Sequence, residues 1–392
     1  MPASSSARPI SVSTPRTSCP PCCGPSAGAT STSTAVSTAR RSRSMRHGWC
    51  SWRASNPAPQ RRAFVMAIDR PLVVLAGPIH PAGRANLETE ARVVVCDDET
   101  EAGFLKMAAE ADGLLFRTKP MCTASLMVAC KRLKVVGRHG VGLDTVDIPA
   151  ATKLGVAVVH APGSNSQSVA EHALMLMLMC AKRARQVDRW TREGNWSARQ
   201  GGNAELKGKT LGIVGIGNIG RLVAKFAGAL GMRVLAFDPY VADDEIRRRG
   251  AEPVRSLDAL LPQADLLTCH TPLTDETRGM INERTLGLMK RGAIFVNTSR
   301  GGVQQERAVF EALVKGQLGA AGLDVFEQEP TPRDNPLLNL DNVVVSSHVA
   351  GVTAEATHTA TIQVTSEMLR VLRGERPHVL ANPEVWPRVG IR

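Results

Sequence analysis

Short apolar runs separated by helical segments constrain the fold of this chain more than any other feature of its sequence. Beyond residue 66 these runs fall into two series, one on each side of residue 165. Strands of a parallel sheet are buried on both faces, so they read as short continuous apolar runs. We therefore expect an α/β fold with two doubly wound parallel sheets. The predicted strands of the first series are Leu72–Leu75, Arg92–Cys96, Gly113–Phe116, Val135–Gly137 and Val156–Val159, and those of the second are Thr210–Val214, Arg233–Phe237, Leu266–His270, Ala293–Asn297, Ala320–Val325 and Val343–Ser346.

Two long helical patterns connect and follow these series. The first, Asn165–Gln186, is rich in Ala, Leu and Met, and Ser168 with Glu171 predicts a capping box at its start. The second, Thr353–Leu372, stops before Gly374, and glycine commonly ends helices. Their positions in the chain predict that both helices return it to the first of two domains.

The first 65 residues differ in composition from the rest of the chain. They contain nine Arg and neither Asp nor Glu, so they hold most of the net charge of +12. They are rich in Ser, Thr and Pro without a sustained apolar period, which predicts a disordered tail. There are two alternatives to a disordered tail. These residues could be a transit peptide, or they could be translated upstream sequence, with the working start of the protein at Met66. A nucleic-acid role inferred from the net charge would rest on this tail, and we expect no nucleic-acid partner.

Composition argues against several other classes of protein. The chain is 43% hydrophobic and 21% charged, which is typical of a globular protein. No apolar run approaches the length of a membrane-spanning helix, so we expect no membrane partner. The nine cysteines are scattered, which favours a reduced, cytoplasmic location. Cys19, Cys22 and Cys23 have no second Cys or His pair at ligand spacing, so we expect no metal site.

A glycine-rich turn follows the first strand of the second series. The sequence reads strand, Gly215-x-Gly217-x-x-Gly220, then helix, and the next strand ends before Asp238. In a dinucleotide-binding turn the first glycine permits the tight turn, the second lets the backbone approach a pyrophosphate, and the third lets helix and strand pack closely. The helix N-terminus adds free N–H groups and a positive dipole end. Asp238 can accept hydrogen bonds from both ribose hydroxyls and would repel a 2′-phosphate, which favours NAD over NADP.

Chemically active side chains follow four strands of the second series, at the edge where open parallel sheets bind ligands. They comprise two histidines, one arginine and a group of carboxylates, namely His270, His348, Arg300, Asp324, Glu327 and Glu329. Interconversion of a ketone and an alcohol needs a cation that orients an anionic substrate and a proton donor with a near-neutral pKa. A neighbouring carboxylate favours the protonated form of such a donor. We therefore expect His348 to be catalytic together with Arg300 and Glu329, and His270 to have a structural role or to line the cofactor site.

These residues together resemble the D-isomer-specific 2-hydroxyacid dehydrogenase family, from about Leu72 to Pro383. The motifs that carry the resemblance are Gly140-Val141-Gly142-Leu143-Asp144, Asn165 with Val169-Ala170-Glu171-His172, the Gly215 turn, His270-Thr271-Pro272-Leu273, Asn297-Thr298-Ser299-Arg300-Gly301, Leu323-Asp324-Val325-Phe326-Glu327-Gln328-Glu329-Pro330, and Ser347-His348 before Gly351. The resemblance implies an NAD-dependent oxidoreductase that interconverts a small 2-keto acid and its D-2-hydroxy acid. A substrate like that of phosphoglycerate dehydrogenase or hydroxypyruvate/glyoxylate reductase is the leading expectation. Glu329 argues against formate dehydrogenase, which carries Gln at that place.

The resemblance also implies roles for individual residues. His348 is the general acid/base, Glu329 is its partner, and Arg300 binds the carboxylate and carbonyl of the substrate. Four further residues would contact the substrate, namely Arg117, Thr118, Val141 and Gly142. The cofactor would lie against the glycine turn, the strand ends beside it and a carboxylate at the nicotinamide end, namely Gly215, Gly217, Asn218, Ile219, Gly220, Asp238, His270, Thr271, Pro272, Thr298 and Asp324.

The resemblance further implies a Rossmann NAD-binding domain, residues 165–345, inserted into a discontinuous flavodoxin-like substrate domain, residues 66–164 and 346–392, after the tail 1–65. Because only 44 residues follow His348, a C-terminal regulatory domain such as some relatives carry is not expected. A homodimer formed through the NAD-binding domain, around Trp190–Asn203, is also implied. An NAD(H)-sensing scaffold or corepressor of the same fold is the alternative function, and the site residues fit either.

Overall fold

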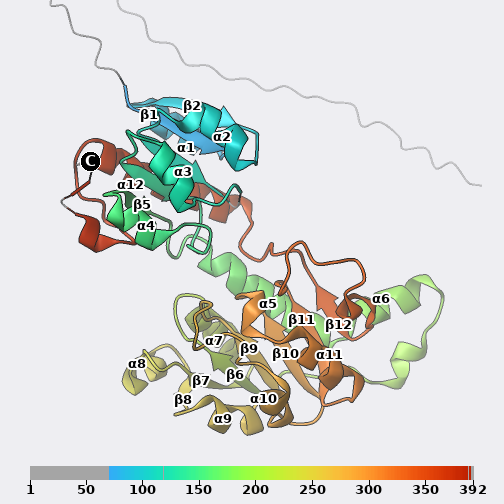
Figure 1. Cartoon of the computed structure of the whole chain (residues 1–392). Helices are drawn as coiled ribbons and strands as arrows, with labels where there is room; N and C mark the ends of the chain where they lie inside the picture. Colours follow the sequence, from blue (N-terminus) through green and yellow to red (C-terminus); the bar gives the residue numbers. More distant parts are fainter. Residues whose placement is uncertain (1–69, 118, 387, 390–392) are drawn as a thin grey trace, which may run out of the picture. The chain divides into compact units, whose positions relative to one another are not determined.

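The computed structural model describes residues 70–117, 119–386 and 388–389, so the predicted tail 1–65 and Thr118 lie outside the described residues (Figure 1). Within this part, the strands form one parallel sheet of five strands and one of seven. The expected α/β architecture with two parallel sheets is confirmed. All predicted strands of both series are present, and their ends differ from the predicted ends by at most two residues.

The five-stranded sheet has the order β2-β1-β3-β4-β5, which is the flavodoxin-like order. Helices α2, α3 and α4 pack on one face, and α1 and α12 on the other. The strands are β1 (Leu72–Ala76), β2 (Arg92–Cys96), β3 (Gly113–Phe116), β4 (Val135–Arg138) and β5 (Ala157–Val159). The helices are α1 (Pro81–Glu88), α2 (Glu101–Ala108), α3 (Ala124–Ala129), α4 (Ile148–Lys153) and α12 (Ala354–Leu372). The last α-helix of the described chain therefore completes the first sheet's core.

The seven-stranded sheet has the order β12-β11-β10-β9-β6-β7-β8, which contains the Rossmann order around β6. Helices α5, α7 and α8 contribute to the core on one face, and α9, α10 and α11 to that on the other. The strands are β6 (Thr210–Val214), β7 (Arg233–Phe237), β8 (Glu252–Pro253), β9 (Leu266–Cys269), β10 (Ala293–Asn297), β11 (Leu318–Leu323) and β12 (Val343–Val345). The helices are α5 (Ser166–Ala181), α6 (Ala184–Arg192), α7 (Gly220–Ala229), α8 (Asp243–Arg248), α9 (Leu257–Leu260), α10 (Glu283–Gly287) and α11 (Glu306–Val314). The short edge strand β8 is not among the predicted strands.

The prediction of one continuous helix over Asn165–Gln186 is wrong. Helix α5 ends at Ala181, and Arg183 adopts a left-handed conformation with φ of 50° before α6 begins. The side chain of Arg183 stabilises this break, because its guanidinium bonds to Gln186 and lies over the ring of Trp190.

The predicted capping box at the start of this helix is also wrong. Asn165 is the N-cap residue of α5. The Ser168 hydroxyl lies 2.9 Å from Thr353 Oγ1, next to α12, and Glu171 accepts a hydrogen bond from Gln167. Ser168 therefore contacts a residue distant in the sequence, and Glu171 contacts Gln167, in place of the capping contacts that the pattern predicted.

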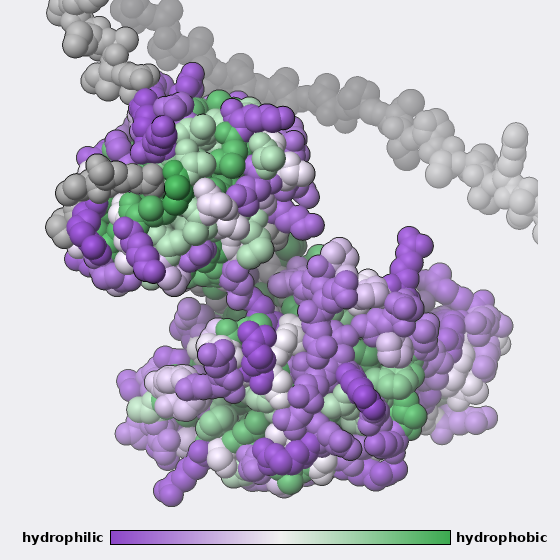
Figure 2. Space-filling view, in the orientation of Figure 1, coloured by the Kyte–Doolittle hydropathy of each residue, from purple (hydrophilic) through white to green (hydrophobic). Residues whose placement is uncertain are grey.

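Hydrophilic side chains cover most of the visible face around the seven-stranded sheet (Figure 2). This surface is expected when helices cover both faces of an apolar sheet. In the described part of the chain, no helix combines the length and the apolar character needed to cross a membrane.

Candidate functional site

A cavity of about 860 Å³ lies at the carboxyl ends of strands from both sheets. Ligands of open parallel sheets bind at this edge, because the loops there leave a crevice where the strand order reverses. Predicted site residues that line the cavity are Arg117, Val141, Gly142, Asn218, Ile219, His270, Thr271, Pro272, Thr298, Arg300, Asp324, Glu329 and His348. The three glycines of the turn and Asp238 lie beside it without lining it, and Thr118 is outside the described residues.

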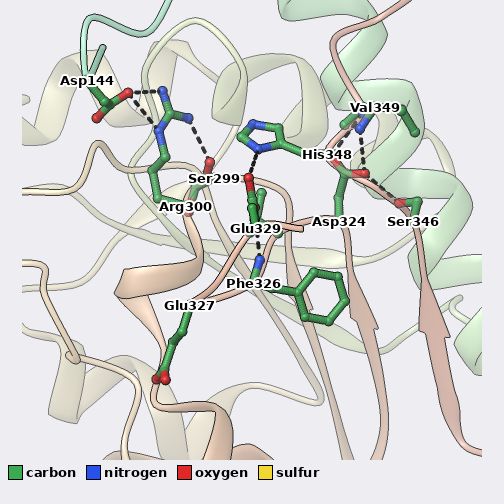
Figure 3. Close-up of polar contacts among 12 residues, drawn as sticks. Asp144, Ser299, Arg300, Asp324, Phe326, Glu327, Glu329, Ser346, His348 and Val349 are labelled. Carbon is green, nitrogen blue, oxygen red and sulfur yellow. Dashed lines mark hydrogen bonds and ion pairs between the residues drawn. The ribbon is translucent and has the colours of Figure 1, made fainter. Parts of the chain in front are cut away.

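His348 and Glu329 form a hydrogen-bonded pair in this cavity (Figure 3). Nδ1 of His348 lies 2.7 Å from Glu329 Oε2, and the other carboxylate oxygen accepts the Phe326 N–H at 3.1 Å. Burial alone would raise the pKa of Glu329, but the hydrogen bonds from His348 and Phe326 lower it below its ordinary value. Glu329 is therefore an ionised carboxylate that orients the imidazole through Nδ1. The other ring nitrogen of His348, Nε2, takes no part in this hydrogen bond.

The carboxylates that follow β11 have three different positions. Glu329 reaches His348, whereas Glu327 points away from the cavity and accepts the Glu306 N–H at the start of α11 (Figure 3). Asp324 is fully buried, and its oxygens accept hydrogen bonds from the segment that carries His348. Of the expected carboxylate cluster, Glu329 is therefore the partner of the His348 imidazole, and Asp324 supports the backbone around His348.

Arg300 follows β10 and pairs with Asp144, which follows β4. Its Nε and Nη2 donate to Asp144 Oδ2 at 3.1 and 2.8 Å, and Nη1 donates to the Ser299 carbonyl (Figure 3). Burial opposes the charge of Asp144, but the Arg300 guanidinium lowers the pKa of that carboxyl below its ordinary value. A Cβ on Gly142 would overlap the Arg300 guanidinium, so only glycine allows this approach. Asp144 and the Ser299 carbonyl thus hold Arg300 in the cavity wall through three of its five N–H donors, which leaves donors for a substrate carboxylate.

Three residues at the carboxyl ends of β3 and β4 also line the cavity, namely Arg117, Arg138 and His139. Arg117 and Arg138 add positive charge, and burial together with the nearby Arg300 lowers the pKa of Arg138 to about 10. His139 is buried, with Nε2 lying 2.5 Å from Thr361 Oγ1 on α12. Burial and the two neighbouring arginines lower the pKa of His139 to about 4. This wall is therefore cationic, with His139 as a neutral group.

The glycine turn has the geometry that the sequence predicts. Gly215 has φ of 87°, and a Cβ on Gly220 would overlap the carbonyl oxygen of Gly215, so the first and third positions both require glycine. A Cβ on Gly217 would meet no atom within 4 Å, which leaves open space over the turn. Asn218 and Ile219 line the cavity just before α7 begins. The turn is thus a backbone cradle with room for a phosphate at a helix N-terminus.

Asp238 is tied to this turn by its own carboxylate. Oδ2 accepts the Ile216 N–H at 3.0 Å, and Oδ1 accepts the Tyr240 N–H at 3.0 Å. Each carboxylate oxygen can accept a second hydrogen bond, so the pair of ribose hydroxyls remains an acceptable partner.

Several buried polar atoms without a hydrogen-bond partner belong to residues that line the cavity. In the described structure these include His270 Nδ1, Thr271 Oγ1 and Thr298 Oγ1, all from residues that line the cavity. Burial lowers the pKa of His270 to about 3, so it is neutral and can donate or accept. Since buried polar groups are normally satisfied, these atoms fit a polar ligand such as a dinucleotide.

Sequence reasoning did not assign Asp144, Arg138 and His139 to the site. Asp144 belongs to the Gly140–Asp144 motif, so a signal for it was present. Arg138 and His139 immediately precede that motif, and the end of β4 brings them into the cavity.

Comparison with known proteins agrees with this geometry. Residues 174–350 match the family model described as "D-isomer specific 2-hydroxyacid dehydrogenase, NAD binding domain". A D-3-phosphoglycerate dehydrogenase of Methanocaldococcus jannaschii is 40% identical over 310 residues, which are 79% of this chain and 59% of that protein. The chain therefore spans little more than half the length of that relative. A hydroxypyruvate reductase of Thermotoga maritima is 41% identical over 273 residues, covering 68% of this chain and 87% of that protein.

Among solved structures, the TT0316 protein from Thermus thermophilus is similar, with a TM-score of 0.73 and 34% identity. The similarity covers 79% of this chain and 99% of that one. The match to the family's NAD-binding domain and the fit of the cradle identify NAD as the cofactor.

Proposed function

Because this chain belongs to the D-isomer specific 2-hydroxyacid dehydrogenase family, we propose that it interconverts a small 2-keto acid and its D-2-hydroxy acid with NAD. The observation that carries the proposal is the placement of Arg300 and the His348–Glu329 pair in one cavity, which Asn218 and Ile219 of the glycine turn also line. A carboxylate-binding cation and an oriented proton donor are the groups that this reaction needs.

In the proposed mechanism Arg300 binds the substrate carboxylate through its guanidinium and turns the carbonyl toward His348. The backbone of Val141 and Gly142 forms the adjoining wall. Glu329 holds Nδ1 of His348, so Nε2 gives its proton to the carbonyl oxygen in reduction and takes it back in oxidation. Bound NAD supplies or accepts the hydride. Asp324 stays buried behind His348 and supports the loop at the nicotinamide end.

The proposed cofactor residues divide by the part of NAD they would hold. Gly215, Gly217 and Gly220, with Asn218 and Ile219, would hold the pyrophosphate through backbone N–H groups. Asp238 would bind the adenosine ribose, and its charge would disfavour the 2′-phosphate of NADP. The cofactor wall is proposed to comprise His270, Thr271, Pro272 and Thr298.

The proposed substrate is a small anionic 2-keto acid, like that of phosphoglycerate dehydrogenase or hydroxypyruvate/glyoxylate reductase. The cationic wall of Arg117, Arg138 and Arg300 supports an anion, and Asp144 is the carboxylate that bonds to Arg300. Thr118, the next residue in the sequence after Arg117, is also proposed to contact the substrate.

The test is NADH oxidation by the full chain with glyoxylate, hydroxypyruvate, 3-phosphohydroxypyruvate and pyruvate, repeated with NADPH. We expect turnover of at least one acid, with kcat/KM higher for NADH by about tenfold or more because Asp238 repels the extra phosphate. The matched control is Asp238→Asn, which keeps the size of the side chain and should reduce the preference. NADH binding without turnover of any acid would contradict the enzyme proposal and favour the scaffold alternative.

We also propose that residues 66–164 and 346–392 form the substrate domain, that 165–345 form the NAD-binding domain, and that the protein is a cytoplasmic homodimer. The packing of α12 on the first sheet supports the discontinuous domain. The thiols of Cys96, Cys122, Cys180 and Cys269 are buried and form no disulfide, in keeping with a reducing compartment.

The proposed dimer interface lies around Trp190–Asn203. Helix α6 has no buried residue and Trp196 is 66% exposed, which supports an interface there. Light scattering should give a dimer, and Trp196→Glu should give a monomer; a monomeric wild type would contradict the interface.

A further inference from the structure

His348 has a backbone conformation that the surrounding structure must maintain. Strand β12 ends at Val345, and the chain then turns with a φ of 56° at His348. A residue other than glycine is strained in this left-handed region and stays there only when its neighbours fix it. The direction of the His348 imidazole therefore depends on what holds residues 346–350.

Asp324 holds this turn on both sides of His348 (Figure 3). Its Oδ1 accepts hydrogen bonds from Ser346 Oγ at 2.6 Å and from the Val349 N–H at 2.9 Å. Its Oδ2 accepts the Ala350 N–H at 2.9 Å, and its backbone carbonyl accepts the His348 N–H at 2.7 Å. Because Asp324 is fully buried, these bonds act where water does not compete with them.

A histidine on α5 continues this set of hydrogen bonds. Nε2 of His172 lies 2.8 Å from Ser346 Oγ and 3.7 Å from Asp324 Oδ1, and the His172 side chain is 16% exposed. Ser346 has one hydroxyl proton, and its short bond to a carboxylate oxygen uses that proton. Ser346 Oγ must then accept a hydrogen bond from His172. The chain of donors therefore runs from His172 Nε2–H to Ser346 Oγ–H to Asp324 Oδ1.

We propose that His172 is a positioning residue for His348 and acts through Ser346 and Asp324. Neither His172 nor Ser346 lines the cavity, so neither touches the reacting groups. His172 fixes the direction of the Ser346 hydroxyl, and that hydroxyl with Val349 N–H holds Asp324 Oδ1 in place. Without the His172 donor, the Ser346 hydroxyl can turn away, and the strained turn at His348 loses one of its supports. The inference rests on the proposed function, because it assumes that His348 transfers the proton.

The main experiment compares His172→Leu and Ser346→Ala with the wild-type full chain, using hydroxypyruvate as the probe substrate. We expect kcat to fall about 10- to 100-fold, by analogy with the loss of a hydrogen-bond partner that orients a metal-ligating histidine. The Kd for NADH should stay within about twofold, because neither side chain reaches the cofactor cradle. His172→Gln retains an N–H donor and should restore kcat to within about threefold of wild type.

A double-mutant cycle separates positioning from general damage. In a His348→Ala background, which should itself lower kcat by about 100-fold, adding His172→Leu should have no further effect. A further fall in kcat in that background, or a fall in NADH affinity as large as the fall in kcat, would overturn the proposal. So would an unchanged kcat in both His172→Leu and Ser346→Ala. The matched control is His358→Leu on α12, whose exposed ring contacts His80 and should leave kcat unchanged.

A second readout does not require turnover. In ¹⁵N-labelled protein, the shifts of His348 Nδ1 and Nε2, read through the non-exchanging ring C–H protons, should change in His172→Leu and return toward wild type in His172→Gln. Unaltered shifts would overturn the positioning role. Wild-type turnover in His348→Ala would instead contradict the proposed function, so the two failures are distinguishable.

Discussion

The histidines around the cavity have opposite environments at the scale of single residues. Burial lowers the pKa of His270 to about 3 and that of His139 to about 4, so both are neutral at physiological pH. His348 is 44% exposed and has Glu329 as a carboxylate partner. Of these three imidazoles, His348 is therefore the one that is both partly exposed and hydrogen-bonded to a carboxylate.

The lowered pKa of His139 predicts a pH-dependent stability. The unfolded chain binds a proton at this imidazole below about pH 6.5, whereas the folded chain binds it only near pH 4. The neutral His139 thus makes its full contribution to the free energy of unfolding above pH 6.5. As the pH falls toward 4, up to about 3 kcal/mol of that free energy is lost. Urea unfolding at pH 7 and pH 4.5 should show a larger loss for wild type than for His139→Asn. Equal losses in the two proteins would contradict the assignment.

At the scale of elements, the glycine turn and α7 form one packed unit. Gly220 begins α7 directly against the carbonyl of Gly215, whereas a Cβ added to Gly228, in the same helix, would meet no atom within 4 Å. The same residue type therefore has two different functions within one helix. The first allows the approach of backbone to backbone, and the second only weakens the helix.

This contrast predicts opposite effects of alanine in α7. Gly220→Ala should lower the free energy of unfolding by about 1–3 kcal/mol and weaken NADH binding, because the added methyl displaces the turn. Gly228→Ala should raise the free energy of unfolding by about 0.5–1 kcal/mol and leave NADH affinity unchanged. Denaturant unfolding and NADH titration measure both effects. A Gly220→Ala protein with wild-type stability and affinity would disprove the packing argument.

At the scale of the whole molecule, the last described α-helix, α12, packs against the first, α1. The five-stranded sheet buries one face against α1 and α12, and their close approach depends on Gly83 in α1. A Cβ on Gly83 would overlap Cγ2 of Thr361 in α12, while the Thr361 hydroxyl contacts His139. The first sheet therefore reaches its stable form only after the chain has passed through the second.

The contact between α1 and α12 predicts a compensating pair of substitutions. Gly83→Ala should lower the free energy of unfolding by about 1–3 kcal/mol, although alanine favours a helix. Thr361→Ser removes the overlapping methyl and keeps the hydroxyl, so it should cost about 1 kcal/mol alone. The double variant should be about as stable as Thr361→Ser. Additive losses in denaturant unfolding would show that the two helices do not meet at this point.

Local patterns in the chain were sufficient to predict the fold class, the strands and the dinucleotide turn, because apolar periodicity and glycine spacing are local properties. They also named five residues of the cavity wall, since strand ends in a parallel sheet share one edge, namely His270, Arg300, Asp324, Glu329 and His348. Long-range packing determined what no local pattern contains. It selected Glu329 rather than Glu327 for His348, paired Arg300 with Asp144, and divided the long helix at Arg183. Each of these outcomes depends on side-chain contacts that form only when the sheets and helices pack together.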